Sequence, residues 1–232
     1  MRRIGQLLVG AILCASVLGG CGGSPERQTP AEWVRENTLI LSQLTSYREA
    51  ERQRGAQRFL NLGKEQGSEV VVYFLNDPVV KDDTRATVML AWLLSRWQDR
   101  RGIPYLLDAL SRGQELQVVV DGLRVYGEDR RILDRLRETV ASSDRNVRSA
   151  STSVLSEMGG ESTLEIVAAR MKSEPDSDIR GQFLLAILEA KPSPRRRELL
   201  VDALTDPDLE IRRFAWTALT EEKGVPRIYD PK

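Results

Sequence analysis

The feature that most constrains the fold of this chain is a pattern that returns at nearly equal intervals. When the copies are aligned on an aliphatic residue followed by arginine, they fall at Thr84-Arg85, Leu116-Gln117, Val147-Arg148, Ile179-Arg180 and Ile211-Arg212. Successive copies lie 32, 31, 32 and 32 residues apart. A fixed period of this length indicates a stack of small units, because each unit buries its apolar surface only against its neighbours.

Each unit reads as two helices joined by a short turn. A first amphipathic segment, such as residues 103–110 or 164–171, has apolar residues three and four positions apart. Turn-forming residues separate it from the second segment, namely Asn76-Asp77-Pro78, Ser111-Arg112-Gly113, Ser142-Ser143-Asp144, Glu174-Pro175-Asp176 and Asp206-Pro207-Asp208. Because the turns are short, the two helices of a unit should run antiparallel.

The second segment of each unit predicts its own buried face. Counted from the aliphatic anchor, offsets 0, +4, +7 and +8 share one side of a helix, and in one copy they are Ile179, Phe183, Ala186 and Ile187. In three units an aspartate lies four residues before the arginine, at Asp144, Asp176 and Asp208. We expect this aspartate to cap the helix start and to pair with the arginine of the same helix.

This pattern resembles HEAT repeats, whose second helix carries an aspartate, an aliphatic-arginine pair and then small and aliphatic positions. The resemblance covers about residues 68–224 and is strongest in the last three units. It departs at Leu116-Gln117, which lacks the arginine, and at Thr84, which replaces the aliphatic residue. It implies an all-α fold, a right-handed α-solenoid of about five HEAT-like two-helix repeats over residues 67–224.

The segments on either side of the repeats have separate roles in this interpretation. Residues 31–66 read as two more helices, either an N-terminal helical cap or a degenerate repeat, because a solenoid end otherwise exposes its apolar core. Residues 225–232 form a short C-terminal tail.

The first twenty residues read as an export signal. A positive start, Met1-Arg2-Arg3, precedes an apolar run from residue 4 to residue 18. The run ends in Leu18-Gly19-Gly20-Cys21, which resembles the bacterial lipobox. The resemblance implies that residues 1–20 are removed, that Cys21 receives diacylglycerol and an acyl chain such as palmitate, and that residues 21–30 are a lipidated linker. The alternatives are an uncleaved anchor or an ordinary secretory signal.

The same resemblance predicts the location of the protein in the cell. Gly22 follows the lipidated residue where the family's sorting rule would need aspartate for retention at the inner membrane. The protein is then expected to be exported and lipid-anchored in the cell envelope, on the periplasmic face of the outer membrane if the cell has two membranes.

Composition argues against several classes of function. Removal of residues 1–20 takes away two arginines and no acid, so 34 − 2 = 32 basic and 34 acidic residues leave a net charge of −2. This charge gives no support to nucleic-acid binding, which depends on neutralising many phosphates. The chain has no histidine, and its one cysteine after processing is assigned to lipid. We therefore expect no metal, no cofactor, no small-molecule substrate and no enzymatic activity, with a carboxylate-only enzyme as the less favoured alternative.

Binding another protein is the function that remains. In HEAT solenoids the second helices line the concave side, so residues one step off the core face should project toward a partner. Large side chains at offset +5, with two arginines beside the last one, give the candidate contact residues Met89, Leu184, Arg212, Arg213 and Trp216. For each, packing between repeats is the alternative. The sequence thus predicts a membrane-anchored scaffold or assembly factor that binds another envelope protein, or else a structural accessory subunit of a larger envelope complex.

Overall fold

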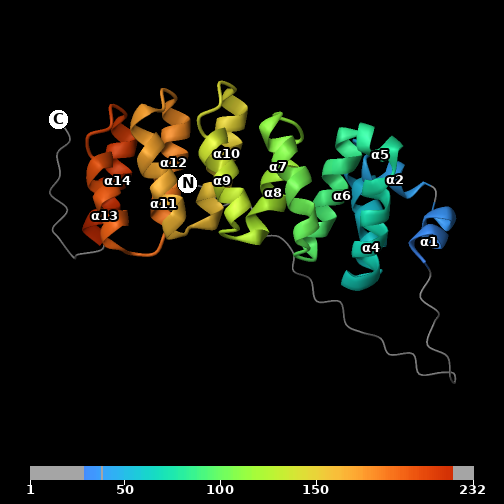
Figure 1. The fold of residues 1–232 in the computed structure, drawn as a ribbon. Helices are drawn as coiled ribbons and strands as arrows, with labels where there is room; N and C mark the ends of the chain where they lie inside the picture. Colours follow the sequence, from blue (N-terminus) through green and yellow to red (C-terminus); the bar gives the residue numbers. More distant parts are fainter. Residues whose placement is uncertain (1–28, 38, 222–232) are drawn as a thin grey trace, which may run out of the picture.

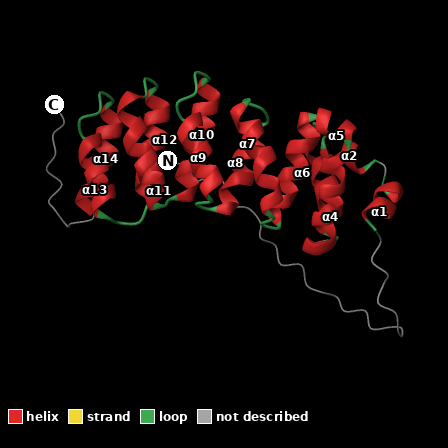
Figure 2. Ribbon diagram, in the orientation of Figure 1, coloured by secondary structure: helices red, strands yellow, loops and turns green. Residues whose placement is uncertain are grey.

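The computed structural model describes residues 29–37 and 39–221, and in this part the chain is helical without any strand (Figures 1 and 2). The export signal, Cys21, residues 22–28 of the linker and the 225–232 tail lie outside the described residues. Among the helices that are described, none has both the length and the apolar character needed to span a bilayer.

The described helices follow one another along the stack. The N-terminal segment contains α1 (Pro30–Glu36), α2 (Ile40–Leu44) and α3 (Glu49–Leu60). The repeats contain α4 (Gly63–Asn76), α5 (Pro78–Asp82), α6 (Thr84–Arg96), α7 (Ile103–Ser111), α8 (Leu116–Leu123), α9 (Arg130–Thr139), α10 (Arg145–Met158), α11 (Glu161–Arg170), α12 (Ser177–Glu189), α13 (Pro194–Ala203) and α14 (Leu209–Glu221). Short 3-10 turns lie at Arg100–Gly102 (η1), Arg124–Tyr126 (η2) and Met171–Ser173 (η3).

These helices form the two layers of an all-α solenoid. The second helices α6, α8, α10, α12 and α14 pack in a row, each against the next. The first helices α7, α9, α11 and α13 form a parallel row in the same way. Each unit closes by contact between its own two helices, as α13 does with α14. The predicted fold class is confirmed.

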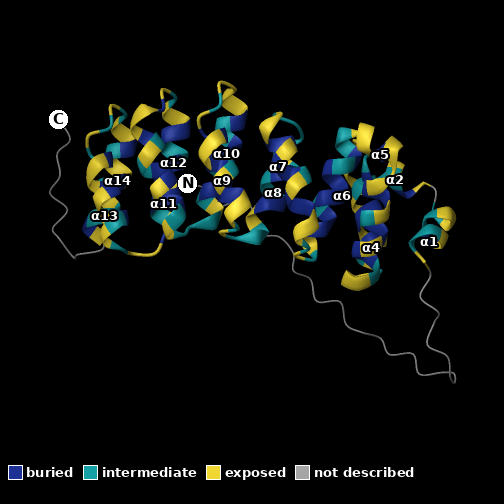
Figure 3. Ribbon diagram, viewed as in Figure 1, coloured by how far each residue is buried: buried dark blue, intermediate teal, exposed yellow. Residues whose placement is uncertain are grey.

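Buried residues follow the stack from one end to the other (Figure 3). The predicted core face of α12 is fully enclosed, because Ile179, Phe183, Ala186 and Ile187 are each 0% exposed. Burying one such large side chain contributes roughly 1.5–3 kcal/mol, which is why the columns of the repeat hold apolar residues there. In α14, the last described helix, Ile211 and Ala215 are buried but the later residues of the face are only partly covered.

The aspartate that precedes the second helices is confirmed as an N-cap. The Asp144 carboxylate accepts from the backbone N–H groups of Asn146 at 2.7 Å and Val147 at 3.4 Å. Asp176 does the same for α12, and Asp208 does so for α14. At the other end of α10, Gly159 has φ of 61°, the left-handed conformation that ends a helix at little cost for glycine. These local signals mark the start of α10, α12 and α14 and the end of α10.

The N-terminal segment contains three short helices where the sequence predicted two. Their core is aromatic, since the Trp33 ring lies 5.3 Å from that of Phe59, which lies 5.9 Å from that of Phe74 in α4. Helix α4 begins at Gly63, four residues before the expected start of the repeats. The segment is therefore packed directly onto the first unit and covers its end.

Candidate functional site

Arginines at the start of the second helices link neighbouring units along one edge of the solenoid. We call Arg85, Arg148, Arg180 and Arg212, together with the acids that pair with them (Glu115, Glu174 and Asp206), the arginine ladder. Arg148 Nη1 donates to the carbonyl oxygen of Ser142, in the turn of its own unit, at 3.0 Å. Its Nε donates to the Glu174 carboxylate, in the turn of the following unit, at 3.0 Å. Each complete step of the ladder thus joins one unit to the next.

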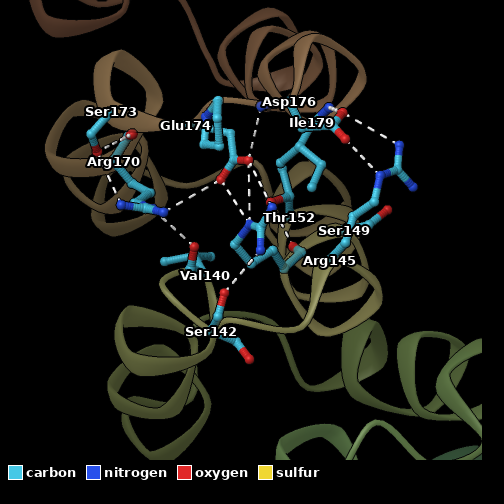
Figure 4. A network of polar contacts seen from close by, with 12 residues as sticks. Val140, Ser142, Arg145, Ser149, Thr152, Arg170, Ser173, Glu174, Asp176 and Ile179 are labelled. Carbon is cyan, nitrogen blue, oxygen red and sulfur yellow. Dashed lines mark hydrogen bonds and ion pairs between the residues drawn. The ribbon is translucent and has the colours of Figure 1, made fainter.

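Figure 4 shows Glu174 within a network of polar contacts, and its side chain is the most enclosed acid of the ladder. Its side chain is 0% exposed and also lies 3.5 Å from Arg170 Nη2. The next step repeats the arrangement, with Arg180 Nε donating to Asp206 Oδ2 at 3.0 Å. Removal of one partner from a buried ion pair typically costs about 3–5 kcal/mol, because the other charge stays buried without compensation. The ladder is therefore a structural element.

This geometry corrects the expected pairing of each arginine with the aspartate of its own helix. Within the described residues, Arg148 and Arg180 bond to the acid two positions before the next aspartate, namely Glu174 and Asp206. The capping aspartates are already bonded to backbone N–H groups at the helix start. The arginine side chains extend across the turn toward the following unit.

The ladder is interrupted in the middle of the stack. Arg85 Nη1 donates to Glu115 at 2.8 Å, so α6 is joined to the turn before α8. Helix α8 then carries the exposed Gln117 where its counterparts carry arginine, and Ser142 stands in the turn before α10 where an acid would be needed. Among the described second helices, the step from α8 to α10 is the one that lacks an arginine–carboxylate pair at this edge.

Close to this interruption lies a groove that crosses α6 between α3 and α8. We call it the tryptophan groove, and it has a volume of about 300 Å³. It is lined by Glu49, Arg52, Gln53 and Ala56 from α3, Met89 and Trp92 from α6, and Gln117, Val118 and Asp121 from α8. Its uncharged apolar surface comes from Ala56, Met89, Val118 and the partly exposed indole of Trp92.

The charged groups of the groove are bonded inside the chain. Arg52 Nη1 donates to the carbonyl oxygens of Ser46 and Tyr47, each at 3.0 Å, and the guanidinium also pairs with Glu49. Trp92 Nε1 donates to Asp121 Oδ2 at 2.6 Å, and Arg124 pairs with the same carboxylate. The groove therefore presents an indole held in a fixed orientation beside groups whose charges are internally balanced.

Two of the predicted contact residues lie in the core. Leu184 is 2% exposed and Met89 is 6% exposed, so packing accounts for Leu184, and Met89 contributes only to the floor of the groove. Offset +5 faces the neighbouring second helix, and Thr152 at the same offset is also fully buried. The expected partner-facing stripe is thus largely enclosed between helices.

The other three predicted contact residues lie together on α14. Arg212 Nη1 donates to the Asp206 carbonyl oxygen at 2.7 Å, as a member of the ladder. Arg213 is exposed and pairs with Glu210 at 2.8 Å, while Trp216 is partly buried. Helix α14 lies at the C-terminal end of the stack, several helices away from α6 and α8, which line the tryptophan groove (Figure 1). A partner contact at Trp216 stays a prediction.

Sequence reasoning missed Trp92, Gln117 and Asp121. Each differs from the residue type found at the equivalent position of the other repeats, and such differences could have pointed to a site. Trp92 stands at offset +8, where the last three units hold Leu155, Ile187 and Leu219. The exposed apolar residues Leu185 (53%) and Phe214 (58%) were also missed, because they lie off the core face at offsets that were not considered.

A second hollow, of about 350 Å³, lies between the turns of the last two units. Its polar lining consists mainly of Glu174, Arg180 and Asp206 of the ladder, together with a Lys172–Asp202 ion pair of 2.8 Å across its side. Among the described residues there is no group of three histidine, cysteine, aspartate or glutamate side chains placed to hold a metal ion. The tryptophan groove is the better candidate for recognition, because its lining is mainly apolar and includes an indole.

Comparison with known families agrees with this architecture. The family model for HEAT repeats matches residues 116–188, from the start of α8 to nearly the end of α12. No curated protein matches the chain. Residues 116–188 thus match HEAT repeats, and they lie within an all-α solenoid whose period and two helical layers agree with that match.

Proposed function

We propose that this protein is an exported, lipid-anchored scaffold that holds another envelope protein against its second helices. HEAT repeats in general mediate protein–protein interaction. The observation that carries the proposal is the tryptophan groove, an open hollow in which Trp92 is partly exposed above a floor of methionine and aliphatic side chains. Tryptophan and methionine are enriched where proteins meet, and tryptophan is frequent among the residues that dominate binding energy.

The anchoring part of the proposal rests on the lipobox-like sequence that ends in Cys21. Between this residue and α1 lie eight residues, 22–29, which reach at most roughly 29 Å at about 3.6 Å each. The solenoid would then work close to its membrane. Stable attachment needs more than one acyl chain, which the diacylated cysteine would supply. With Gly22 after the cysteine, the proposed site is the periplasmic face of the outer membrane in a cell that has two membranes.

Fractionation of cells that produce Cys21→Ser tests the anchor. The wild-type protein should pellet with membranes and take up labelled palmitate, whereas the variant should be unlabelled and remain in the supernatant. A variant that still pellets and resists a high-salt wash would show that attachment does not depend on lipid at Cys21.

A photo-crosslinking amino acid placed at Gln117 tests the scaffold. This exposed residue lies at the rim of the groove, so light should join the full-length protein to a specific envelope partner in the cells that make it. The matched control is the same amino acid at Arg130 on α9, whose side chain is 95% exposed in the first-helix layer. Identical adducts from both positions, or none from Gln117, would argue against recognition at the groove.

A further inference from the structure

We propose that the tryptophan groove anchors one large, uncharged apolar side chain carried by an extended segment of the partner protein. This inference rests on the proposed scaffold function and adds the chemistry of the segment that is recognised. It is carried by the size of the groove, the pairing of its charges, the amides at its rim and the departures from the repeat that meet there.

The size of the groove limits what it holds. A volume of about 300 Å³ lies at the lower end of the range for small-molecule sites, about 300–1,000 Å³. The groove is also open to solvent along the surface of α6, between two flanking helices. A single anchoring side chain with a short length of its backbone matches this space better than a whole ligand does.

The pairing of the charges selects against a charged occupant. Arg52 and Asp121 are each bonded to partners within the chain. A charged side chain entering the groove would lose water, and each counter-charge that it meets there, on Glu49, Arg52 or Asp121, is already shared with a partner in the chain. Burial of an uncompensated charge is strongly unfavourable, whereas an apolar side chain gains about 25 cal/mol for each Å² removed from water.

The rim favours an extended backbone. Gln53 on α3 and Gln117 on α8 lie on opposite sides of the groove, and each carries an amide that both donates and accepts. Gln53 Nε2 donates to Glu49 at 2.9 Å, which fixes that amide in place and leaves its carbonyl oxygen able to accept. An extended segment has free main-chain N–H and C=O groups to bond with such amides, whereas a helix has already paired its own.

The repeat pattern supports this assignment because two columns change at the groove. An arginine in place of Gln117 would follow the rule of the other second helices, and its guanidinium would add a charge at the rim. Trp92 occupies a column that holds leucine or isoleucine in the last three units, yet its indole is partly exposed. Both departures produce an uncharged, partly open apolar surface at the same place.

The protein's own remaining segments are weaker candidates for the occupant. Residues 22–28 contain no large apolar side chain. Residues 222–232 contain Val225, Ile228 and Tyr229, but in the sequence they come after α14, which is several helices away from α6 and α8 in the stack (Figure 1). A segment of another protein therefore fits the observations best.

Selection from a library of random 12-residue peptides tests the inference. The target is the mature chain with Cys21→Ser, so that no lipid is present. We expect the selected peptides to share one large apolar residue with uncharged neighbours. Their affinity should fall on the order of tenfold or more for Trp92→Ala, as for a truncated hot-spot residue. It should also fall for Gln117→Arg, which adds a charge at an exposed position and leaves the core intact. The matched control, Phe214→Ala on α14, should bind as the wild type does.

Several results would overturn the inference. Selected peptides rich in acidic or basic residues, or equal affinity for the wild type and both groove variants, would show that the groove does not take an uncharged apolar anchor. Displacement of the selected peptides by a synthetic peptide of residues 222–232 would assign the groove to the protein's own segment. A partner that crosslinks at Gln117 through a charged or helical segment would overturn this inference alone, whereas apolar peptide binding without any crosslinked partner would overturn the scaffold proposal alone.

Discussion

From α10 to α14 the arginine ladder ties each second helix to the turn of the next unit, whereas the step from α8 to α10 is missing and the tryptophan groove opens on the other side of α8. The buried carboxylate of Glu174 marks the first region, and the exposed amide of Gln117 marks the second. Both regions are built from the same two-helix unit. They differ in the residues that fill a few columns of the repeat.

This contrast separates two roles for the polar residues of a solenoid. Where a column holds arginine and the following turn holds an acid, the two side chains pair with each other between units. They then offer few free polar groups to a partner. Where the column holds glutamine, the edge loses a link and a surface becomes available. We therefore expect departures from the repeat to be better guides to an interaction site than its regular positions.

The largest effect should follow from removal of the ladder's central carboxylate. Glu174→Ala leaves Arg148 and Arg170 partly buried without their shared counter-charge, and it should lower the free energy of unfolding by about 3–5 kcal/mol. Urea denaturation followed by circular dichroism measures this loss. The matched control is Glu210→Ala, which removes an exposed ion pair with Arg213 and should cost under about 1 kcal/mol. Equal losses from the two variants would show that the ladder does not stabilise the C-terminal units.

Two adjacent leucines of α12 give the next largest contrast. Leu184 is 2% exposed and Leu185 is 53% exposed. Leu184→Ala should therefore lower the free energy of unfolding by about 2–5 kcal/mol through the cavity it leaves, whereas Leu185→Ala should change it by about 0.5 kcal/mol or less. Thermal denaturation of both variants makes the comparison. A stable Leu184→Ala protein that fails to capture a partner would restore Leu184 as a contact residue.

Only part of this structure could be predicted from the sequence. The period, the buried face through Ile179 and Phe183 and the capping aspartates were predictable because they depend on contacts within one helix or one unit. The partner of Arg148 was not predictable in this way, because Glu174 reaches it only through the packing of one unit on the next. The angle between successive units sets that distance, and it emerges from all the side chains between the helices.

The candidate site also depends on contacts between units, and these could not be predicted from the sequence. Offset +5 was expected to face outward, but the close approach of neighbouring second helices encloses Leu184 and most of Met89. The groove also needs α3 from the N-terminal segment, whose position the repeat pattern does not specify. Trp92 and Gln117 were visible in the sequence as departures, but only the structure shows that they line the same hollow.

Adding the missing ion pair between α8 and the turn before α10 should have a smaller effect on stability. In the double variant Gln117→Arg with Ser142→Glu, the pair would join the α8 edge to the turn before α10. We expect a gain of about 0.5–1 kcal/mol in the free energy of unfolding, since the new pair lies near the surface. Amide exchange in residues 116–123 should slow at the same time. Either single variant serves as the control, because it supplies one charge without its partner. A double variant no more stable than the sum of the single ones would show that the missing pair does not weaken this junction.

Acid should produce the smallest difference in stability between the two halves of the stack, because each half contains an aspartate whose pKa is lowered by an arginine. In the N-terminal half, Asp99 accepts from Arg101 Nη2 at 2.7 Å, and this bond lowers the pKa of the Asp99 carboxyl. In the ladder half, the bond from Arg145 likewise lowers the pKa of Asp176. A carboxyl whose pKa is lower in the folded state stabilises the fold above its unfolded pKa, about 3.9, and this stabilisation is lost as the pH falls through the folded pKa.

Hydrogen exchange compared at pH 7 and pH 3 tests this expectation. Once exchange is corrected for its intrinsic pH dependence, segments 99–111 and 174–189 should lose protection together below about pH 4. Asp99→Asn should remove most of the acid response of the first segment while leaving the second unchanged. If the second segment alone lost protection, acid would act through the arginine ladder as a whole, and the two halves would differ in their electrostatics as well as in their packing.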